Sequence, residues 1–417
     1  MHDALLNLLR CPFCGTRLSL VDTGATVRIN GQIRSGVIGC GCCAFPIVSG
    51  IPVLIADDVT RQAVHALEAG RPEDALLGLL GLQGNRIEQF RTLLATPEVT
   101  YQSALKLLSV DAEGTYFLYR FSDPTFLVAE AIVRALTPYG VTRNGPILDL
   151  CGGCGHLTNV LASLAPSVVT PAQTVITDLY FWKLWLATRF TAPGAAAVCC
   201  NADAPLPFAR DLFSMVVLTD AFPYIWHKRL CADEMARVSR SDGTLLLPHL
   251  HNAVGENFSA GNTLSPADYR DLFAMGHTKL FSDATLLDDL LTNAAVDLTK
   301  HRSPEAIGDE PSLTLVASSL SSTFKVHAIP ERDDLEGELI VNPLYVVDRG
   351  HERSVLTLTF PTPEYEAEFE DCRRYLPASV TIDADVSGPL APAMFGSQYS
   401  ELRRRRILVD APPRYRD

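Results

Sequence analysis

The stretch that decides the fold is GPILDLCGGCGHLT, residues 145–158. An apolar strand pattern ends at Asp149, and a turn of small residues then leads into a helix pattern that begins near His156. Glycines at 153 and 155 permit positive φ and let a ligand approach the backbone. The free N–H groups at the start of such a helix suit a negatively charged ligand group. The stretch therefore predicts a strand, a ligand-binding turn and a helix.

Strand and helix patterns alternate on both sides of this turn, from about residue 113 to 320. This alternation predicts an α/β fold in which a parallel sheet carries helices on both faces. In such a sheet the ligand lies beyond the carboxyl ends of the strands, at the point where the strand order reverses. The predicted strands are 146–150, 174–177, 196–200, 215–219 and 243–247, with a later pair near 296–300 and 312–317.

Acidic residues follow these strands at the edge where the ligand is expected. Asp178 ends the second strand and is placed to accept hydrogen bonds from ribose hydroxyls. Asp203 belongs to the stretch Asn-Ala-Asp after the third strand and could reach an adenine amino group, and Asp220 follows the fourth strand. The pattern indicates a nucleoside-containing ligand.

These segments, in this order, resemble class I S-adenosylmethionine-dependent methyltransferases over roughly residues 140–320. The similar motifs are LDLCGGCGHLT, Asp178, NADAPLPF and EMARVSRSDGTLLL. The resemblance implies a Rossmann-like sheet, S-adenosyl-L-methionine as the cofactor and methyl transfer as the activity. It implies that the cofactor is contacted by Asp149, Cys151, Gly153, Gly155, Asp178, Asp203 and Asp220. Cys151 stands where the family motif usually has glycine. A dinucleotide-binding dehydrogenase and a glycine turn that serves packing alone are the alternatives.

An aromatic run, YFLYRFSD at 116–123, precedes the sheet. We expect it to close over the cofactor, with Arg120 meeting the cofactor's carboxylate. The alternative is an amphipathic core helix.

Methyl transfer to oxygen or nitrogen aligns an acceptor with the methyl group and removes the acceptor's proton, for which histidine is the usual residue near neutral pH. His249 and His251, in LLLPHLHNA, end the fifth predicted strand two residues apart. We predict that they and Tyr224 are the catalytic residues. The alternatives are histidines that cap the strand end and a pair of metal ligands, although no third ligand of obvious spacing accompanies them. His227 is expected to be an exposed helix residue.

Eleven cysteines favour metal binding in a reducing compartment over disulfides, because they are clustered. Cys11-x-x-Cys14 and Cys40-x-x-Cys43 form two knuckles that suit a structural, tetrahedral Zn²⁺ site. Cys42 competes for a place in the second knuckle. Reduced, buried cysteines and a redox pair are the alternatives.

The stretch LLRCPFCGTRL, the second knuckle and AFPIVSGIPVLI together resemble the Trm112-like (UPF0434) zinc-ribbon domain, over roughly residues 5–55. The second knuckle lies closer to the Phe-Pro pair than is usual in that family. The resemblance implies a domain that is a partner or appendage of a methyltransferase.

The length of 417 residues fits two or three domains. Residues 59–115 are rich in Leu, Ala and Glu, and their apolar residues recur at spacings of three and four. This pattern predicts two or three helices there. The basic run Arg403–Arg406 is expected to be a solvated helix end rather than a phosphate site. The predicted segments are 1–58 (zinc ribbon), 59–115 (helical linker), 116–322 (methyltransferase domain, with a substrate-capping insertion at 252–292) and 323–417 (a C-terminal α+β appendage).

Composition restricts the function further. The net charge of −13 argues against a general binder of nucleic-acid backbones, and no apolar run is long enough for a membrane span. The N-terminus does not resemble a signal peptide, so we expect a cytoplasmic protein. The predicted substrate is a small-molecule methyl acceptor, and a homodimer is left open. The alternatives are a non-catalytic, methyltransferase-like scaffold and an S-adenosylmethionine-binding enzyme with a non-methylating reaction.

Overall fold

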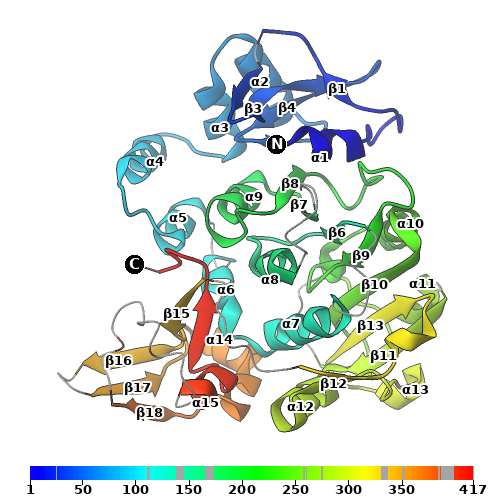
Figure 1. Cartoon of the computed structure of the whole chain (residues 1–417), viewed down its shortest axis with the longest axis vertical. Coiled ribbons are helices and arrows are strands. Elements are labelled where there is room, and N and C mark those ends of the chain that lie inside the picture. Colours follow the sequence, from blue (N-terminus) through cyan, green and yellow to red (C-terminus); the bar gives the residue numbers. More distant parts are fainter. Residues whose placement is uncertain are drawn as a thin grey trace.

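A central sheet organises the chain. Within the residues that the computed structural model describes, seven strands form this sheet in the order β11-β13-β10-β9-β6-β7-β8 (Figure 1). The described residues are 1–24, 26–109, 113–137, 145–164, 173–256, 259, 261–273, 276–329, 337–349, 353–383, 386 and 399–416. The strands are β6 (Ile147–Asp149), β7 (Thr174–Asp178), β8 (Ala196–Cys199), β9 (Phe213–Val217), β10 (Ser239–His251), β11 (His277–Ser282) and β13 (Ser312–Ser318).

The sheet is mostly parallel. Strands β6 to β10 pair in parallel, whereas β13 runs antiparallel to both β10 and β11. The chain proceeds from β6 to β7 and β8 on one side, and then returns to place β9 and β10 on the other. This is the predicted Rossmann-like class I methyltransferase sheet, and its order reverses beside β6, where a ligand crevice is expected.

Both faces of the sheet are covered, so its strands are apolar on both sides. Ile147 and Leu148 are fully buried and belong to different hydrophobic cores, as the two-residue period of a strand requires. One core contains side chains of α7 (Pro124–Leu136), α8 (His156–Leu164), α9 (Phe181–Leu186) and α12 (Asp283–Asn293). The other contains side chains of α10 (Lys228–Val238) and α11 (Pro266–Leu272).

The N-terminal region forms a small β-structure that docks on the sheet. It consists of α1 (Asp3–Leu8), β1 (Ser19–Leu20), β2 (Val27–Ile29), β3 (Gln32–Gly39), β4 (Ala44–Val48) and β5 (Ile51–Pro52). A parallel bridge joins Val53 to Cys199, the last residue of β8, and the Arg10 amide donates to the Pro207 carbonyl at 2.9 Å. Because β8 is the edge of the central sheet, this docking covers an otherwise open strand edge.

The segment after the ribbon is helical, as predicted, but richer in helices than expected. Its described residues form four of them, α2 (Asp58–Glu68), α3 (Pro72–Leu79), α4 (Asn85–Ala95) and α5 (Tyr101–Leu108), followed by α6 (Glu113–Tyr119). Asp57 caps α2 through its bond from the Thr60 amide at 2.7 Å, and Gly70 and Gly81, both at positive φ, follow α2 and α3. No helix in the described ranges combines the length and apolar character that a membrane span needs.

The structure corrects two sequence-based expectations about the sheet. Segment 252–292, predicted as a substrate-capping insertion, contributes the edge strand β11 to the sheet and so is not wholly an insertion; its capping role stays a prediction. The predicted strand near 296–300 lies outside the central sheet, since β12 (Ala295–Asp297) pairs with β14 (Val326–Ala328). Strand β11 was missed because its text, HTKLFS, has few apolar residues; only its last three residues are buried.

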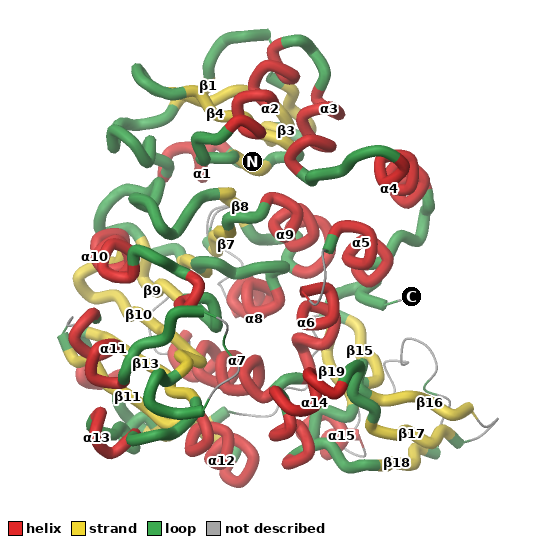
Figure 2. The backbone as a smooth tube through the Cα atoms, turned by 180° about the vertical axis from the view of Figure 1, so that it is seen from behind, coloured by secondary structure: helices red, strands yellow, loops and turns green. Residues whose placement is uncertain are grey.

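The C-terminal part is more than an appendage. It contains β15 (Glu338–Val341), β16 (Tyr345–Arg349), β17 (Ser354–Leu358), α14 (Pro363–Glu368), β18 (Ser379–Ile382), α15 (Ser400–Arg404) and β19 (Leu408–Ala411). The three-stranded β16–β18 sheet lies at the end of the molecule opposite the ribbon, whereas the chain end returns to α5 (Figures 1 and 2). There the amides of Tyr101 and Gln102 donate to the carbonyls of Arg414 and Tyr415.

Tyr415 anchors this return. Its ring is 1% exposed and stacks on that of Tyr101 with centroids 4.8 Å apart. Its hydroxyl lies 2.9 Å from His156 Nε2 at the start of α8 and 3.0 Å from the Phe117 carbonyl in α6. The end of the chain is therefore part of the core that supports the glycine turn.

We expect Tyr415→Ala to lower the free energy of unfolding by about 3–5 kcal/mol, because it empties an aromatic site in the core. Tyr415→Phe should cost only about 1 kcal/mol, since it removes the hydroxyl's hydrogen bonds and keeps the ring. Chemical denaturation measures both, with the exposed Val346→Ala as a control that changes stability little. Equal stability of Tyr415→Ala and the control would contradict this assignment.

His156 should make stability depend on pH. Burial lowers the pKa of its imidazole to about 3, so the folded protein keeps this ring neutral while the unfolded chain protonates it below about pH 6.5. Stability is thus lost as the pH falls below that value. Relative to His156→Phe, the wild type should lose about 2 kcal/mol between pH 7 and pH 5. A stability difference that stays constant over this range would show that the ring is protonated equally in both states.

Candidate functional site

The glycine turn follows β6 at the reversal of the strand order. Cys151, Gly153 and Gly155 all have positive φ, between 57° and 84°. The Gly152 amide donates to the Thr177 carbonyl at 2.9 Å, which ties the turn to β7. A Cβ on Gly152 would lie 2.8 Å from the Asp149 carboxylate, so a side chain there has no room. The turn is therefore held close to both neighbouring strands.

Asp149 supports this turn from inside the protein. It is 1% exposed and accepts a hydrogen bond from the Thr158 hydroxyl of α8 at 2.6 Å. Burial raises the pKa of its carboxyl to about 7. The expected direct contact of Asp149 with the cofactor stays a prediction, and the structure adds an internal partner for its carboxylate.

Asp178 faces the turn from the end of β7. Its Oδ2 accepts from the Gly153 amide at 3.1 Å, and its Oδ1 accepts from the Tyr180 amide at 2.9 Å. Each carboxylate oxygen has a second lone pair, so two acceptor positions remain for ribose hydroxyls. Burial raises its pKa, while the ammonium of Lys183 opposes that rise. Leu179 and Tyr180, the next residues, are 42% and 52% exposed and offer an apolar surface beside the carboxylate.

Asp203 has a local role that the sequence did not indicate. Its Oδ1 accepts from the His227 amide at 2.7 Å, and the imidazole Nδ1 of His227 lies 3.4 Å away. This contact joins the loop after β8 to the start of α10. His227 is exposed, as expected, at the N-cap of α10.

Helix α6 covers the glycine turn. A Cβ on Gly153 would lie 2.7 Å from the Phe117 ring, so this aromatic side chain packs directly on the turn. The expected closure of the aromatic run over a cofactor stays a prediction, and the burial of Phe117 and Phe121 also agrees with the alternative of a core helix. Arg120 is already held elsewhere, because its Nη1 donates to both oxygens of Asp123 at 2.9 Å within the protein. Its assignment to a cofactor carboxylate stays a prediction.

Three predicted residues meet where β9 and β10 end: Asp220 follows β9, and His249 and His251 lie in the last residues of β10. Asp220 Oδ1 lies 3.3 Å from His251 Nε2, and one ligand atom from each of Asp220, His249 and His251 lies within 4.8 Å of the others. The two imidazole centroids are 4.7 Å apart at 74°. We call these residues the Asp-His-His cluster. It stands next to the glycine turn, because β9 pairs with β6.

Residues that the sequence did not indicate hold this cluster in place. The Tyr116 hydroxyl of α6 donates to Asp220 Oδ2 at 2.8 Å. His249 Nδ1 lies 3.0 Å from Asp283 Oδ2, and the Thr314 hydroxyl donates to Asp283 Oδ1 at 2.7 Å. Tyr116, Asp283 and Thr314 come from three segments distant from the cluster in the chain, so no spacing in the sequence could have predicted these contacts.

The charges in the cluster are coupled. Burial opposes ionisation of Asp220, yet the hydrogen bond from His251 and the nearby His249 and Arg120 hold its pKa well below the usual range. Burial also opposes protonation of His249, but the bond to Asp283 and the charge of Asp220 raise its pKa. The cluster therefore places a carboxylate that stays ionised beside two imidazole rings.

Tyr224 lies near this cluster but is not part of it. It ends a short 3₁₀ helix after Asp220 and is 60% exposed, and Trp226 follows with 81% exposed. Burial of its hydroxyl and the charge of Asp220 both raise the pKa of Tyr224. These two aromatic rings form an exposed apolar surface at the carboxyl edge of the sheet. A catalytic role for Tyr224 stays a prediction.

The cysteines form a second candidate site in the ribbon. One sulfur from each of Cys11, Cys14, Cys40 and Cys42 lies within 4.8 Å of the others. The Cys14–Cys40 and Cys40–Cys42 sulfur distances are 3.6 and 3.4 Å. Four thiolates around one Zn²⁺ stand roughly 3.8 Å apart, given bonds of about 2.3 Å, so the group fits this ion. The expected fourth residue, Cys43, is not a member of this group, although its sulfur lies 3.5 Å from that of Cys42.

The backbone explains why Cys42 rather than Cys43 belongs to the group of four sulfurs. The Cys40 amide donates to the Cys43 carbonyl at 2.9 Å, which closes a tight turn, and β4 starts immediately afterwards at Ala44. Cys42 lies at the exposed tip of that turn, whereas Cys43 is partly buried against the core at its base. The alternative that the sequence left open is thus the one that the structure favours.

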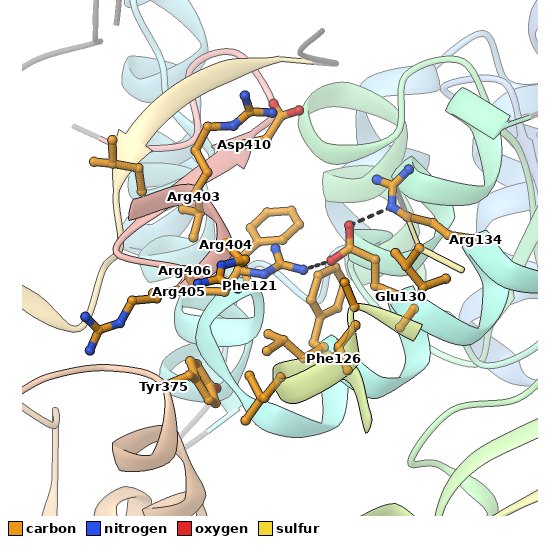
Figure 3. A pocket seen from close by; sticks show the side chains of 18 of the residues that line it. Phe121, Phe126, Glu130, Arg134, Tyr375, Arg403, Arg404, Arg405, Arg406 and Asp410 are labelled. Atoms are coloured by element: carbon orange, nitrogen blue, oxygen red, sulfur yellow. Dashed lines mark hydrogen bonds and ion pairs between the residues drawn. The ribbon is translucent and has the colours of Figure 1, made fainter. Parts of the chain in front are cut away.

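The arginine run is not fully solvated. Arg406 is partly buried and pairs with Glu130 of α7, which also accepts from Arg134 Nε at 2.9 Å (Figure 3). These groups line a pocket of about 480 Å³ between α7, α8 and the C-terminal segment. The remaining members of the run, Arg403 to Arg405, line the same pocket. The prediction of a solvated helix end therefore holds for Arg404 and Arg405, which are exposed, but not for Arg406, which pairs with Glu130.

No protein-family model matches the chain, and no curated protein matches it significantly. Among solved structures, it is similar to a SAM-dependent methyltransferase from Aquifex aeolicus, with 11% identity over 51% of this chain and 100% of that chain and a TM-score of 0.34. It is also similar to geranyl diphosphate C-methyltransferase from Streptomyces coelicolor (12% identity, 55% and 86% covered, TM-score 0.32). A third is a complex of the Haloferax volcanii Trm112 methyltransferase activator with a methyltransferase (16% identity, 51% and 97% covered, TM-score 0.33). At these scores, the fold assignment depends on the strand order itself.

The sulfur geometry makes a testable distinction between adjacent cysteines. We expect Cys42→Ala to lose most of the bound zinc and to lower the melting temperature, because three thiolates leave the tetrahedron incomplete. Cys43→Ala should keep one zinc per chain. Metal analysis of the purified proteins measures both. Loss of zinc from Cys43→Ala alone would show that the ion selects the other sulfur.

Proposed function

We propose that this protein is a methyltransferase that transfers a methyl group from S-adenosyl-L-methionine to a small-molecule acceptor through oxygen or nitrogen. The observation that carries the proposal is the position of Asp178. It is bound to the glycine turn at the reversal of the strand order, keeps two acceptor positions and has exposed apolar residues beside it.

The residues present fit the nucleoside part of this cofactor. Asp178 would accept hydrogen bonds from the ribose hydroxyls, and Leu179 and Tyr180 would pack against the adenine ring. The positive-φ turn at Cys151 to Gly155 brings backbone close to the ligand without a side chain at Gly152. Phe117 would flank the methionine end, because it already packs on Gly153.

The Asp-His-His cluster would orient the acceptor. When bound, S-adenosyl-L-methionine supplies a methyl group that is already activated by the positive sulfur, so alignment and exclusion of water remain as the protein's tasks. Asp220 and the two imidazoles stand where β9 and β10 end, next to the glycine turn. They would hold the acceptor's oxygen or nitrogen and assist the departure of its proton.

The exposed aromatic side chains favour a small, planar acceptor over a macromolecule. Tyr224 and Trp226 offer stacking surfaces at the carboxyl edge of the sheet, where the acceptor must enter. The net charge of −13 also disfavours a nucleic acid. We further propose that the N-terminal ribbon is a Trm112-like domain with a structural Zn²⁺ ion. It would stabilise the β8 edge from within the same chain. We also propose that the protein works in the cytoplasm, where its thiols stay reduced.

Calorimetric titration with S-adenosyl-L-homocysteine tests the cofactor site. We expect the wild type to bind and Asp178→Ala to bind roughly 10- to 100-fold more weakly, because hydrogen bonds to a charged acceptor are lost. Asp242→Ala, which removes an exposed carboxylate paired with Arg240, is the matched control and should bind as the wild type does.

Absence of binding to the folded wild type would overturn the proposal and favour the non-catalytic scaffold. Binding that is equal in Asp178→Ala and the control would place the nucleoside elsewhere. If binding follows the prediction, the mass of the product from candidate acceptors then distinguishes methylation from a non-methylating reaction.

A further inference from the structure

We propose that Asp220, His249 and His251 bind a divalent first-row transition-metal ion, separate from the zinc of the ribbon. Two imidazoles and one carboxylate converge here from two neighbouring strands, with their ligand atoms within 4.8 Å of one another. The sequence suggested His249 and His251 as a ligand pair but offered no third member. The third member is Asp220, which lies 29 positions before His249 and meets it only through the pairing of β9 with β10.

The distances suit a bound ion. Nitrogen and oxygen atoms that share one ion at about 2.0–2.2 Å stand roughly 3.0–3.5 Å apart. Asp220 Oδ1 and His251 Nε2 are 3.3 Å apart, which falls inside that interval. The cluster could therefore enclose an ion with little rearrangement of these two side chains.

The partners of the cluster orient it as ligands are oriented in metal sites. A metal-bound histidine usually donates its other ring N–H to a carboxylate, which fixes the ring and its tautomer. His249 fits this arrangement, because its Nδ1 lies 3.0 Å from Asp283 Oδ2, which leaves Nε2 as the nitrogen that would bind the ion. The Tyr116 hydroxyl likewise occupies Asp220 Oδ2 and leaves Oδ1 for the ion.

The backbone around the cluster is strained in a way that ordinary packing does not require. Asp220 has φ of 60° and His249 has φ of 56°, although neither is glycine. The pairing of β10 with β13 shifts register between Leu247 and Leu250, so His249 lies in a bulge. Non-glycine residues at left-handed φ are strained, and both such residues and bulges are concentrated at functional sites, where they direct side chains. Here they direct two of the three proposed ligands toward one point.

The ligand set selects the class of ion. Imidazole nitrogen favours Zn²⁺, Fe²⁺, Co²⁺ or Ni²⁺ over Mg²⁺ and Ca²⁺, which prefer oxygen. Three protein ligands also leave open positions for a substrate atom.

The role of the ion rests on the proposed function, whereas the site itself does not. In methyl transfer, a hydroxyl acceptor bound to the ion would lose its proton to solvent more readily, since a cation lowers the pKa of a bound oxygen. The resulting oxygen would then attack the methyl carbon: the O–C bond forms as the C–S bond breaks, and the neutral thioether leaves. The acceptor class is therefore an oxygen nucleophile.

Titration of the metal-free, full-length protein with Co²⁺ tests the site, because the two predicted sites differ in ligand atoms. We expect two Co²⁺ ions per wild-type chain. One shows thiolate-to-cobalt charge transfer and is lost in Cys42→Ala. The other shows only ligand-field bands and is lost in His251→Ala. The exposed His277→Ala is the matched control and should keep both ions.

Asp283→Asn provides a second variant in case His251→Ala is misfolded, since it keeps all three ligands. It should weaken the sulfur-free site roughly 10- to 100-fold, as loss of a ligand's hydrogen-bond partner does. A wild-type chain that binds one Co²⁺ ion, through sulfur alone, would overturn the inference. So would a second ion that survives unchanged in both His251→Ala and Asp283→Asn.

Binding of S-adenosyl-L-homocysteine, measured on the same samples, separates the two proposals. Nucleoside binding without a second metal ion would refute the metal site and leave the methyltransferase proposal intact. A second metal ion without nucleoside binding would support the metal site and refute the methyltransferase proposal.

Discussion

The hydrogen bond between the Gly153 amide and the Asp178 carboxylate is the contact on which the rest of the site depends. It connects the turn after β6 to the end of β7, across the point where the strand order reverses. Because Gly152 also donates to the Thr177 carbonyl, the turn cannot move away from β7 without losing both bonds. Asp149 and Thr158 hold the same turn from the helix side. The backbone that would receive a ligand is thus fixed before any ligand arrives.

Two distant segments complete this support. Phe117 of α6 packs on Gly153, and Tyr415, near the end of the chain, bonds to the Phe117 carbonyl and contacts His156 at the start of α8. The buried, neutral imidazole of His156 therefore links the C-terminal segment to the helix that follows the turn. Residues more than 250 positions apart in the chain stabilise a single loop, so the C-terminal part belongs to the functional unit.

The Asp-His-His cluster depends on polar partners rather than on the packing that supports the glycine turn. His251 is buried and Asp220 and His249 are largely shielded from solvent, which is unfavourable unless their polar atoms have partners. Tyr116, Asp283 and Thr314 supply such partners from three further segments. The positive φ values at Asp220 and His249 are an additional cost. A group that is costly to assemble and fully supported on its outer side suggests a functional constraint, whereas a strand cap would need neither feature.

The sequence by itself determined the elements with strong local patterns. Strands such as 147–149 and 174–178 are buried on both faces, so their apolar runs identified them, and the small residues at 151–155 identified the turn. The local spacing of the cysteine pairs likewise indicated a cysteine cluster near the N-terminus, and the structure contains one; its zinc and its family stay predictions. Only the tertiary structure decided the place of β11 in the sheet and the joining of Asp220 with His249 and His251, and it groups Cys42 rather than Cys43 with the other three cysteines. Each of these features depends on contacts between residues that are distant in the sequence. Such contacts produce no periodic pattern of residues from which they could be predicted.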